Sequence, residues 1–506
     1  MKSLLTLLSA LLLVFAFPDF ERWWIAWIAL VPFFWVIYKV KDFKWQALFF
    51  GWIWGTLFFF GSCWWLTYAL IHYGGIPAVL AYLFIFLGAV FVGFFKAIFA
   101  FFLAFLLSKY GVRAVLVAPF LWVSIEFLRF QVTGNNWNAI AYSQAFVPYI
   151  ASLASVGGIW LVGFLVVLVN SSLVLMLLVF FEKKTLDFMG IVALAFVIFV
   201  FFGLLFRSQI ENKGELAAKL IVLQPNVPMS GLDYYLWEEL KGKHIKKAED
   251  ALSALYLEEE IPRVVIFPES PMNFSYGRDE SLRKLFGEFT RQNRVSLLFN
   301  SAEPNPEVGN FFNSAVMIDE RGQKVGQYDK IFLVPFGEYA PVPSFLQDVV
   351  PTIVGNFAFG KEFDLFSIGR AKAGVMICFE SHFPNLSRQY AIQGADFLIE
   401  LTNDGYLGRT PVLRQHLANA VFRAVETSRP VVRATNVGIT AFITEEGFVL
   451  DEAEPYTEAV RIWKVRKNDT KPTFYVKYGD WLAFLSLILS FFFLVFGKYG
   501  FGGFKR

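Results

Sequence analysis

Residues 374–381 read Gly-Val-Met-Ile-Cys-Phe-Glu-Ser, an apolar run that is followed at once by the thiol of Cys378 and a carboxylate. A short apolar run bounded by polar residues is typical of a strand buried in a sheet. A second such run, Val264–Phe267, is followed by Pro268 and Glu269, and the proline fixes the turn that leaves the strand. Both segments therefore predict a buried strand that delivers a reactive side chain at its end.

The same pattern recurs over residues 215–470, where short apolar runs alternate with helical stretches. Further strands are expected at about 220–223, 295–299, 315–318, 397–401, 431–434 and 440–444. Helices are expected at about 233–258, 279–293 and 411–427, the last with apolar residues recurring at helical spacing. Strands that alternate with helices indicate an α/β or layered α+β domain over this region.

The chain as a whole is too apolar for an ordinary soluble protein, since 56% of its 506 residues are hydrophobic and 61 are Phe, and the long apolar segments lie outside 215–470. A helix that crosses a bilayer needs ~20 apolar residues. We expect seven such spans within 1–207, at about 3–17, 23–38, 46–70, 77–107, 112–130, 160–181 and 188–206, and an eighth within 479–498. The first resembles a signal peptide, but the bulky sequence after it offers no cleavage site and favours an uncleaved anchor.

The short connections between these spans alternate between basic and non-basic. Basic residues gather in every second connection and after the last span, at Lys39, Lys41, Lys44, Lys109, Arg113, Lys183, Lys184, Lys498, Lys505 and Arg506. Basic loops remain in the cytoplasm, so both termini, including the tail 499–506, are predicted to be cytoplasmic. Seven preceding spans then place the domain at 215–470 outside the cytoplasmic membrane.

Charge and cysteine content argue against several classes of protein. The net charge of +3 gives no indication of a nucleic-acid partner. The two cysteines, Cys63 and Cys378, form no disulfide framework, and the four histidines lack the spacing of a zinc site. We therefore expect no metal and no cofactor. A free thiol outside the cytoplasm, where thiols tend to oxidise, is easier to explain by chemistry than by packing.

Three of the expected strand ends carry groups suited to reaction at a carbonyl. The thiolate of Cys378 would be the nucleophile, Glu269 would exchange its proton, and Lys330, after Tyr328-Asp329, would stabilise an oxyanion. Each residue also has an ordinary interpretation: a buried apolar cysteine, a helix-capping glutamate and a surface lysine. Their occurrence together, each at the end of an apolar strand or in a Pro/Gly-rich loop, favours catalysis.

The sequences FPES at 267–270, YDK at 328–330, PFGEY at 335–339 and ICFES at 377–381 resemble the nitrilase superfamily. That superfamily has an α-β-β-α sandwich fold and a Glu-Lys-Cys triad. Longer strings resemble bacterial apolipoprotein N-acyltransferases, and they lie at 330–341, 401–408, 415–416 and 429–438, with FAFP at 15–18 and AYSQ at 141–144 in the apolar region. The resemblance therefore extends over nearly the whole chain.

The resemblance implies roles residue by residue: Glu269 as general acid and base, Lys330 as stabiliser of thiolate and oxyanion, and Cys378 as the acylated nucleophile. The remaining matches are supporting positions at Glu338, at Glu380 and at the backbone N–H of Phe379, and a loop near the lipid entrance formed by Asn403, Asp404 and Tyr406. The family often has Tyr at position 379 and Trp at position 406. The missing hydroxyl at position 379 argues against a proton role for the Phe379 ring.

The reaction that this resemblance implies moves a phospholipid acyl chain to Cys378 as a thioester. The chain then passes to the N-terminal α-amine of a diacylglyceryl-modified apolipoprotein, the last step of lipoprotein maturation, and the enzyme is expected to be a monomer in the bacterial inner membrane. Two other classes stay open: a membrane-tethered amidase or nitrilase that releases the acyl group to water, and a non-catalytic transporter or receptor.

Two polar features of the apolar region are not explained by the triad. Lys96 lies inside the fourth expected span, where a functional site, snorkelling to the interface and a hydrogen bond inside the bundle all remain open. The stretch Asn135–Asn138 is predicted to be re-entrant or interfacial, near the lipid entrance.

Overall fold

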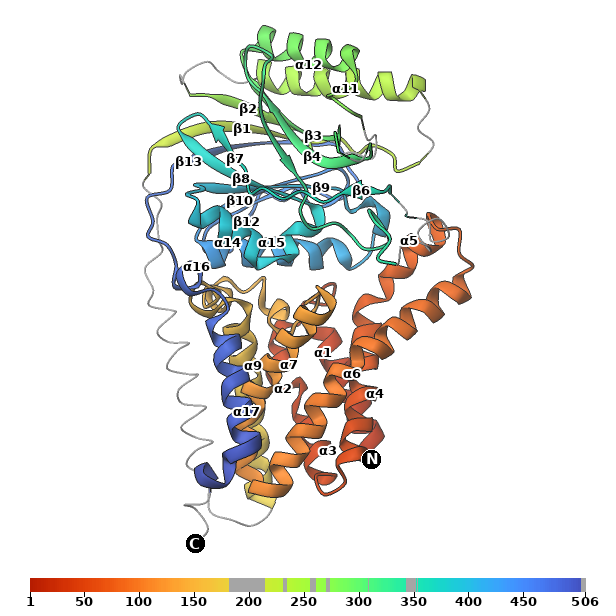
Figure 1. Ribbon diagram of the computed structural model, residues 1–506, viewed down its shortest axis with the longest axis vertical. Helices are drawn as coiled ribbons and strands as arrows, with labels where there is room; N and C mark the ends of the chain where they lie inside the picture. The colour runs from red at the N-terminus through yellow and green to blue at the C-terminus, as the bar shows by residue number, and fades with distance from the viewer. Residues whose placement is uncertain are drawn as a thin grey trace. The chain divides into compact units, whose positions relative to one another are not determined.

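The computed structural model describes residues 1–181, 214–230, 234–254, 261–269, 274–307, 309–342, 352 and 354–501. The chain divides into two compact units, one formed by Met1–Gln209 with Tyr478–Arg506 and the other by Ile210–Lys477. Figure 1 colours both units by residue number. The span predicted at 188–206 lies outside the described residues.

The first unit consists of apolar helices. Among the described residues, four helical stretches are long and apolar enough to cross a membrane: Lys44–His72, Ala78–Tyr110, Val112–Thr133 and Ala154–Phe181. They comprise α4 (Lys44–Cys63), η2 (Trp64–Leu66), α5 (Thr67–His72), α6 (Ala78–Tyr110), η3 (Val112–Val117), α7 (Ala118–Thr133) and α9 (Ala154–Phe181). The shorter helices are α1 (Lys2–Ala16), η1 (Trp23–Ile25), α2 (Ala26–Ala29), α3 (Val31–Lys39), η4 (Ile140–Gln144), α8 (Pro148–Ala151) and α17 (Trp481–Phe501). An apolar helix thus occupies each predicted span that falls in the described residues.

Helices α4 and α6 pack closely because glycines face one another between them. A Cβ atom at Gly51 would lie 2.5 Å from the carbonyl oxygen of Lys96, and one at Gly55 would lie 2.6 Å from the carbonyl oxygen of Gly93. Small residues allow helix backbones to approach in this way inside an apolar bundle.

The ammonium of Lys96 is buried in the same bundle. Its Nζ donates to Glu126 Oε1 at 3.2 Å and lies 3.4 Å from the centre of the Trp122 ring. The hydrogen bond inside the bundle, one of the three interpretations left open by the sequence, is therefore present. The amide of Asn138 likewise donates to the carbonyl oxygen of Ser62 at 3.3 Å and to Cys63 Sγ at 3.4 Å.

The second unit contains two sheets. The first has the order β13 (Ala459–Arg466), β1 (Leu216–Gln224), β2 (Arg263–Ile266), β3 (Ser296–Pro304), β4 (Phe311–Ile318) and β5 (Lys324–Asp329), with β6 (Phe357–Ala358) beside β4. The second has the order β12 (Val449–Leu450), β11 (Ala441–Ile443), β10 (Val431–Thr435), β9 (Phe397–Thr402), β8 (Ala371–Ile377) and β7 (Leu365–Ile368). Each sheet is built around three parallel neighbours, β1-β2-β3 and β8-β9-β10.

Helices cover the outer face of each sheet, so the unit has four layers (Figure 1). Helices α11 (Tyr234–Ser253) and α12 (Glu280–Asn293) pack on the first sheet in one core of buried residues that includes Ile221, Val265 and Phe286. Helices α14 (Pro384–Ile392) and α15 (Val412–Thr427) cover the second sheet. The short elements are η5 (Cys378–His382), η6 (Asp404–Leu407) and α16 (Phe474–Tyr478).

All eight strands expected from the sequence are present, as are the three helices expected in this region. Among the described residues, eight elements of the unit were not predicted: β6, β7, β12, β13, α14, α16, η5 and η6. Of β5, only the end at Lys330 was expected. The layered fold positions the candidate residues because Glu269 follows β2, Lys330 follows β5 and Cys378 follows β8. Three strand ends from two sheets thereby meet at one place.

Candidate active site

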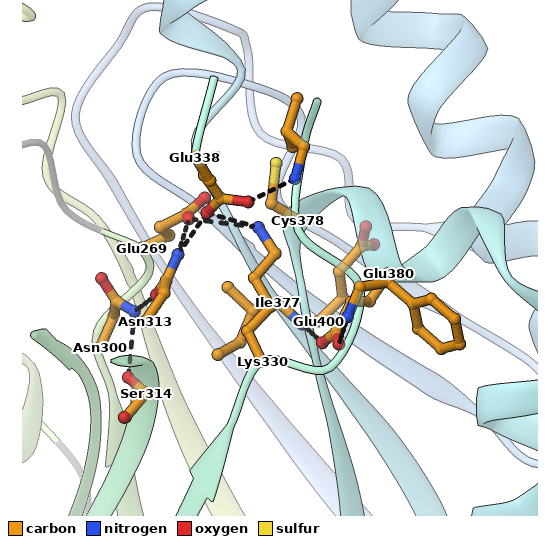
Figure 2. Close-up of polar contacts among 12 residues, drawn as sticks. Glu269, Asn300, Asn313, Ser314, Lys330, Glu338, Ile377, Cys378, Glu380 and Glu400 are labelled. Carbon is orange, nitrogen blue, oxygen red and sulfur yellow. Dashed lines mark hydrogen bonds and ion pairs between the residues drawn. The ribbon is translucent and has the colours of Figure 1, made fainter. Parts of the chain in front are cut away.

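Cys378 lies at a sharp turn between β8 and η5. Its backbone φ is +52°, a left-handed conformation that costs a non-glycine residue roughly 1–3 kcal/mol. The turn takes the residue out of the strand ladder, and its thiol lies beside Glu269 (Figure 2). Burial raises the pKa of this thiol well above its ordinary value, and the Glu269 carboxylate raises it further, while Lys330 lowers it. The resting group is therefore a neutral thiol that needs a base.

Glu269, Lys330 and Glu338, with the amide of Asn313, form a compact cluster beside this thiol (Figure 2). Lys330 Nζ donates to Glu338 Oε1 at 2.9 Å and lies 4.0 Å from Glu269 Oε1. Asn313 Nδ2 donates to both carboxylates, at 2.7 Å to Glu338 and at 3.0 Å to Glu269. We call Glu269, Lys330 and Glu338 the triad cluster.

The two carboxylates of the triad cluster are not equivalent. The second oxygen of Glu338 accepts from the backbone N–H of Val334 at 2.8 Å, so both its oxygens are held by protein donors. Glu269 lies farther from the lysine ammonium, at 4.0 Å against 2.9 Å for Glu338, and accepts a hydrogen bond from Asn313. Burial raises the pKa of Glu269, Lys330 lowers it, and the negative charge of Glu338 raises it again, leaving the pKa above its ordinary value. Glu269 is consequently the carboxylate suited to exchange a proton.

Lys330 is held by the backbone as well as by its charge. Its N–H donates to the carbonyl oxygen of Asn313, and its carbonyl oxygen accepts from the N–H of Gly360, both at 2.8 Å. A Cβ atom at Gly360 would fall 1.9 Å from the carbonyl oxygen of Asp329, so this close approach requires glycine. Burial lowers the pKa of the ammonium, but Glu338 and Glu269 outweigh it and raise the pKa. Lys330 is therefore charged wherever the fold is intact.

Glu380 joins the Cys378 turn to the loop that follows Lys330. Its carboxylate accepts from four donors, which are Tyr328 Oη at 2.7 Å and the backbone N–H groups of Ile331, Phe332 and Ile377 at 2.8, 3.1 and 2.8 Å. Burial raises the pKa of Glu380 to about 7, against the effect of Lys330 and of these donors. The residue fixes two loops rather than facing the thiol.

The predicted lipid-entrance residues have different environments. Asn403 and Asp404 are buried; Asn403 caps η6 through the N–H of Gly405, and Asp404 pairs with His416 and Arg433. Tyr406 is half-buried in η6. Only Tyr406 among the three retains the exposure that an entrance would need, and that role stays a prediction. The ring of Phe379 stacks on His382 with centroids 5.2 Å apart.

Sequence reasoning missed Asn313, His416, Glu400 and Arg433 as members of the site. A signal for two of them was present, since Glu400 and Arg433 interrupt the apolar strands β9 and β10, and a charge in a buried strand must be paired. Asn313 lies in β4 without a comparable signal. Among the described residues, no group of three or more His, Cys, Asp or Glu is placed to hold a metal ion.

Each of the two units matches a known protein family. Residues 9–172 match the family described as Apolipoprotein N-acyltransferase N-terminal domain, and residues 210–475 match the one described as Carbon-nitrogen hydrolase. A protein of Allorhizobium ampelinum named apolipoprotein N-acyltransferase is 30% identical over 440 residues, which cover 82% of this chain and 79% of that protein. The chain belongs to the apolipoprotein N-acyltransferase family.

Other relatives agree with this assignment. The apolipoprotein N-acyltransferase of Geobacter metallireducens is 28% identical over 487 residues, covering 95% of this chain and 92% of that protein. Among solved structures, an amidase from Nesterenkonia sp. is 16% identical, with coverage of 53% of this chain and 95% of that one and a TM-score of 0.36. The resemblance found in the sequence is therefore confirmed. The predictions that the chain is an acyltransferase and that it contains a nitrilase-like α/β domain are confirmed as well.

Proposed function

We propose that this chain transfers an acyl group from a phospholipid to the N-terminal α-amine of a diacylglyceryl-modified apolipoprotein through a thioester on Cys378. The observation that carries the proposal is the half-buried, neutral thiol of Cys378 beside the Glu269 carboxylate, whose pKa is raised, with the Lys330 ammonium 4.0 Å from that carboxylate (Figure 2). These are the parts that nucleophilic acyl transfer requires.

In the first half of the reaction, Glu269 takes the thiol proton as the sulfur attacks the ester carbonyl of the phospholipid. Lys330 and the backbone N–H of Phe379 stabilise the oxyanion of the tetrahedral intermediate. The carbon–oxygen ester bond then breaks, and Glu269 returns the proton to the oxygen of the departing lysophospholipid. The enzyme retains the acyl group as a thioester.

In the second half, the α-amine of the apolipoprotein attacks the thioester carbonyl. Glu269 accepts a proton from the amine, the carbon–sulfur bond breaks, and the thiolate is reprotonated by Glu269. An amide is formed and the enzyme is restored. Holding the acyl group on Cys378 means that two lipid substrates need not occupy the site together.

The apolar unit would keep the thiol close to the surface where both lipid substrates reside. We propose eight spans, with the four long apolar helices, the shorter apolar helices and residues 188–206 contributing to them. In this arrangement the termini are cytoplasmic, residues 215–470 form the catalytic domain on the outer side of the inner membrane, and the enzyme acts as a monomer. The alternation of basic loops supports this orientation.

The proposal is tested by incubating the full-length protein with phospholipid in detergent and measuring its intact mass. The wild type and Cys63→Ser should gain the mass of one acyl chain, whereas Cys378→Ala should gain none. Lys330→Met should slow the appearance of the adduct by about 10²–10³-fold, because an oxyanion donor is lost. Absence of any adduct on the wild type would refute the thioester.

The fate of the adduct separates the transferase from a membrane-tethered hydrolase. Without an amine acceptor, the acyl adduct of a transferase should persist, and addition of a diacylglyceryl-modified peptide with a free α-amine should discharge it as the amide. Rapid loss of the adduct to water, with a free fatty acid as the product, would favour the hydrolase. A Cys378→Ala protein with full activity would refute both.

A further inference from the structure

A second group of buried charges contacts Cys378 through its backbone. Glu400 in β9, Asp404 in η6, His416 in α15 and Arg433 in β10 form what we call the His416 cluster. Arg433 Nη1 lies 2.5 Å from Glu400 Oε2, and Arg433 Nη2 lies 2.9 Å from Asp404 Oδ2. His416 Nδ1 lies 2.6 Å from Asp404 Oδ1, and its Nε2 lies 3.2 Å from Glu400 Oε1.

The imidazole of His416 also reaches the nucleophile. Its Nε2 lies 3.1 Å from the carbonyl oxygen of Cys378, which also accepts from Ser381 Oγ at 3.3 Å. Nδ1 therefore lies beside a carboxylate oxygen, and Nε2 lies beside two oxygens, those of the Glu400 carboxylate and of the Cys378 carbonyl. A neutral imidazole leaves one ring nitrogen without a proton to donate, whereas an imidazolium donates from both nitrogens. The cluster is then electrically balanced, with two carboxylates against two cations.

The peptide that His416 contacts is the one on which the proposed chemistry depends. Its carbonyl belongs to Cys378, whose φ of +52° is not a conformation that cysteine adopts without support. Its N–H belongs to Phe379 and is the second proposed oxyanion donor. A group that fixes the carbonyl of a planar peptide also fixes the direction of the N–H on its opposite edge.

We propose that His416, as an imidazolium, is a positioning residue that holds the Cys378–Phe379 peptide so that the thiol faces Glu269 and the N–H faces the reacting carbonyl. This inference rests on the proposed function and assigns a role to a residue outside the triad. The charged groups that face the ring are Asp404, Glu400 and Arg433. Burial and Arg433 lower the pKa of His416, but the two carboxylates outweigh them and raise it to about 9.

Two neutral amide variants separate positioning from mere stability. In His416→Gln the amide nitrogen replaces Nε2 and still reaches the Cys378 carbonyl, but the contact to Asp404 is lost. In His416→Asn the amide nitrogen replaces Nδ1 and still reaches Asp404, but the contact to the Cys378 carbonyl is lost. Both remove the same charge, so both should lower the thermal midpoint to a similar extent.

The measurement is made on the full-length protein in two ways: the rate of acyl adduct formation from phospholipid vesicles, and the rate of alkylation of Cys378 by iodoacetamide, followed by peptide mass. We expect His416→Asn to slow both by 10-fold or more, and His416→Gln to remain within about threefold of the wild type. The wild-type rate of acylation should also fall as the pH rises through about 9, and this alkaline decline should be absent in His416→Gln.

Equal rates for the two variants, or an alkaline decline that persists in His416→Gln, would overturn the positioning role. The alkylation arm uses no lipid, so it reports on His416 even if the proposed function fails. A wild type that is alkylated normally but never acquires an acyl group would refute the proposed function, while the alkylation rates of the two variants would still decide the role of His416.

Discussion

Cys378 contacts two buried charge clusters, the triad cluster with its thiol and the His416 cluster with its carbonyl. The triad cluster has two carboxylates and one cation, and its Glu269 side chain is 15% exposed. The His416 cluster has two carboxylates and two cations when His416 is protonated, and its side chains are 0–5% exposed. The triad cluster therefore has one more negative than positive charge and is partly exposed to solvent. The His416 cluster has equal numbers of both charges and is buried.

This difference decides which cluster can move a proton. In the triad cluster burial and the negative charge of Glu338 raise the pKa of Glu269 against the effect of Lys330, which makes this carboxylate a better proton acceptor than an ordinary glutamate. In the His416 cluster the removal of a proton would leave a buried carboxylate without its partner, which is costly. The first arrangement suits acid–base exchange, and the second suits holding a strained turn in place.

The largest expected effect comes from removing the titratable group of the triad cluster. Glu269→Gln should slow acyl adduct formation by about 10²–10⁴-fold, because general acid–base catalysis is lost. Its thermal midpoint should not fall, since the raised pKa means that the ionised carboxylate costs stability in the folded state. The adduct is followed by intact mass and the midpoint by intrinsic fluorescence.

Glu303→Gln is the matched control for this experiment. Glu303 is also a buried carboxylate of the same unit, and it accepts from Ser301 and from the N–H of Gly277, away from Cys378. It should leave the acylation rate within about threefold of the wild type. A Glu269→Gln protein that acylates like this control would mean that another group takes the thiol proton.

The second-largest expected effect is a loss of stability when a charge is removed from the His416 cluster. Arg433→Met leaves Glu400 and Asp404 with one cation between them, and removal of one partner from a buried ion pair typically costs about 3–5 kcal/mol. The thermal midpoint should fall accordingly. Glu400→Gln combined with Arg433→Met restores the charge balance and should recover part of the loss. Equal midpoints for the single and double variants would show that charge balance does not stabilise this cluster.

The sequence predicted those parts of the fold that depend on local pattern. Apolar runs such as Val264–Phe267 and Gly374–Ile377 correspond to β2 and β8, and the reactive residues stand at the strand ends where they were expected. Strand β13 was missed because Ala459–Arg466 alternates charged and apolar residues and lies at the sheet edge, where burial is slight. An edge strand has no continuous apolar signal.

The sequence alone predicted those site residues whose own side chains are chemically reactive. Glu269, Lys330 and Cys378 could be chosen because thiol, carboxylate and ammonium at strand ends are unusual. Asn313 and His416 could not be chosen in this way, because their roles arise from contacts across 44 and 38 residues of sequence, to Glu269 and to Cys378. The first contact depends on the order of strands in the first sheet and the second on how α15 packs beside the end of β8, and no local pattern reports either.

The smallest effect is a dependence of stability on pH. Because the pKa of His416 is raised from 6.5 to about 9, the folded state binds this proton more tightly than the unfolded state does. The resulting stabilisation, roughly 3 kcal/mol at most, is complete below pH 6.5 and is lost as the pH rises through 9. The thermal midpoint of the wild type, measured from pH 6 to 10, should therefore fall more steeply than that of His416→Gln. All other groups should titrate alike in the wild type and in His416→Gln. Parallel curves of thermal midpoint against pH would therefore show that His416 is not an imidazolium in the folded state, and that the charges of the His416 cluster do not balance.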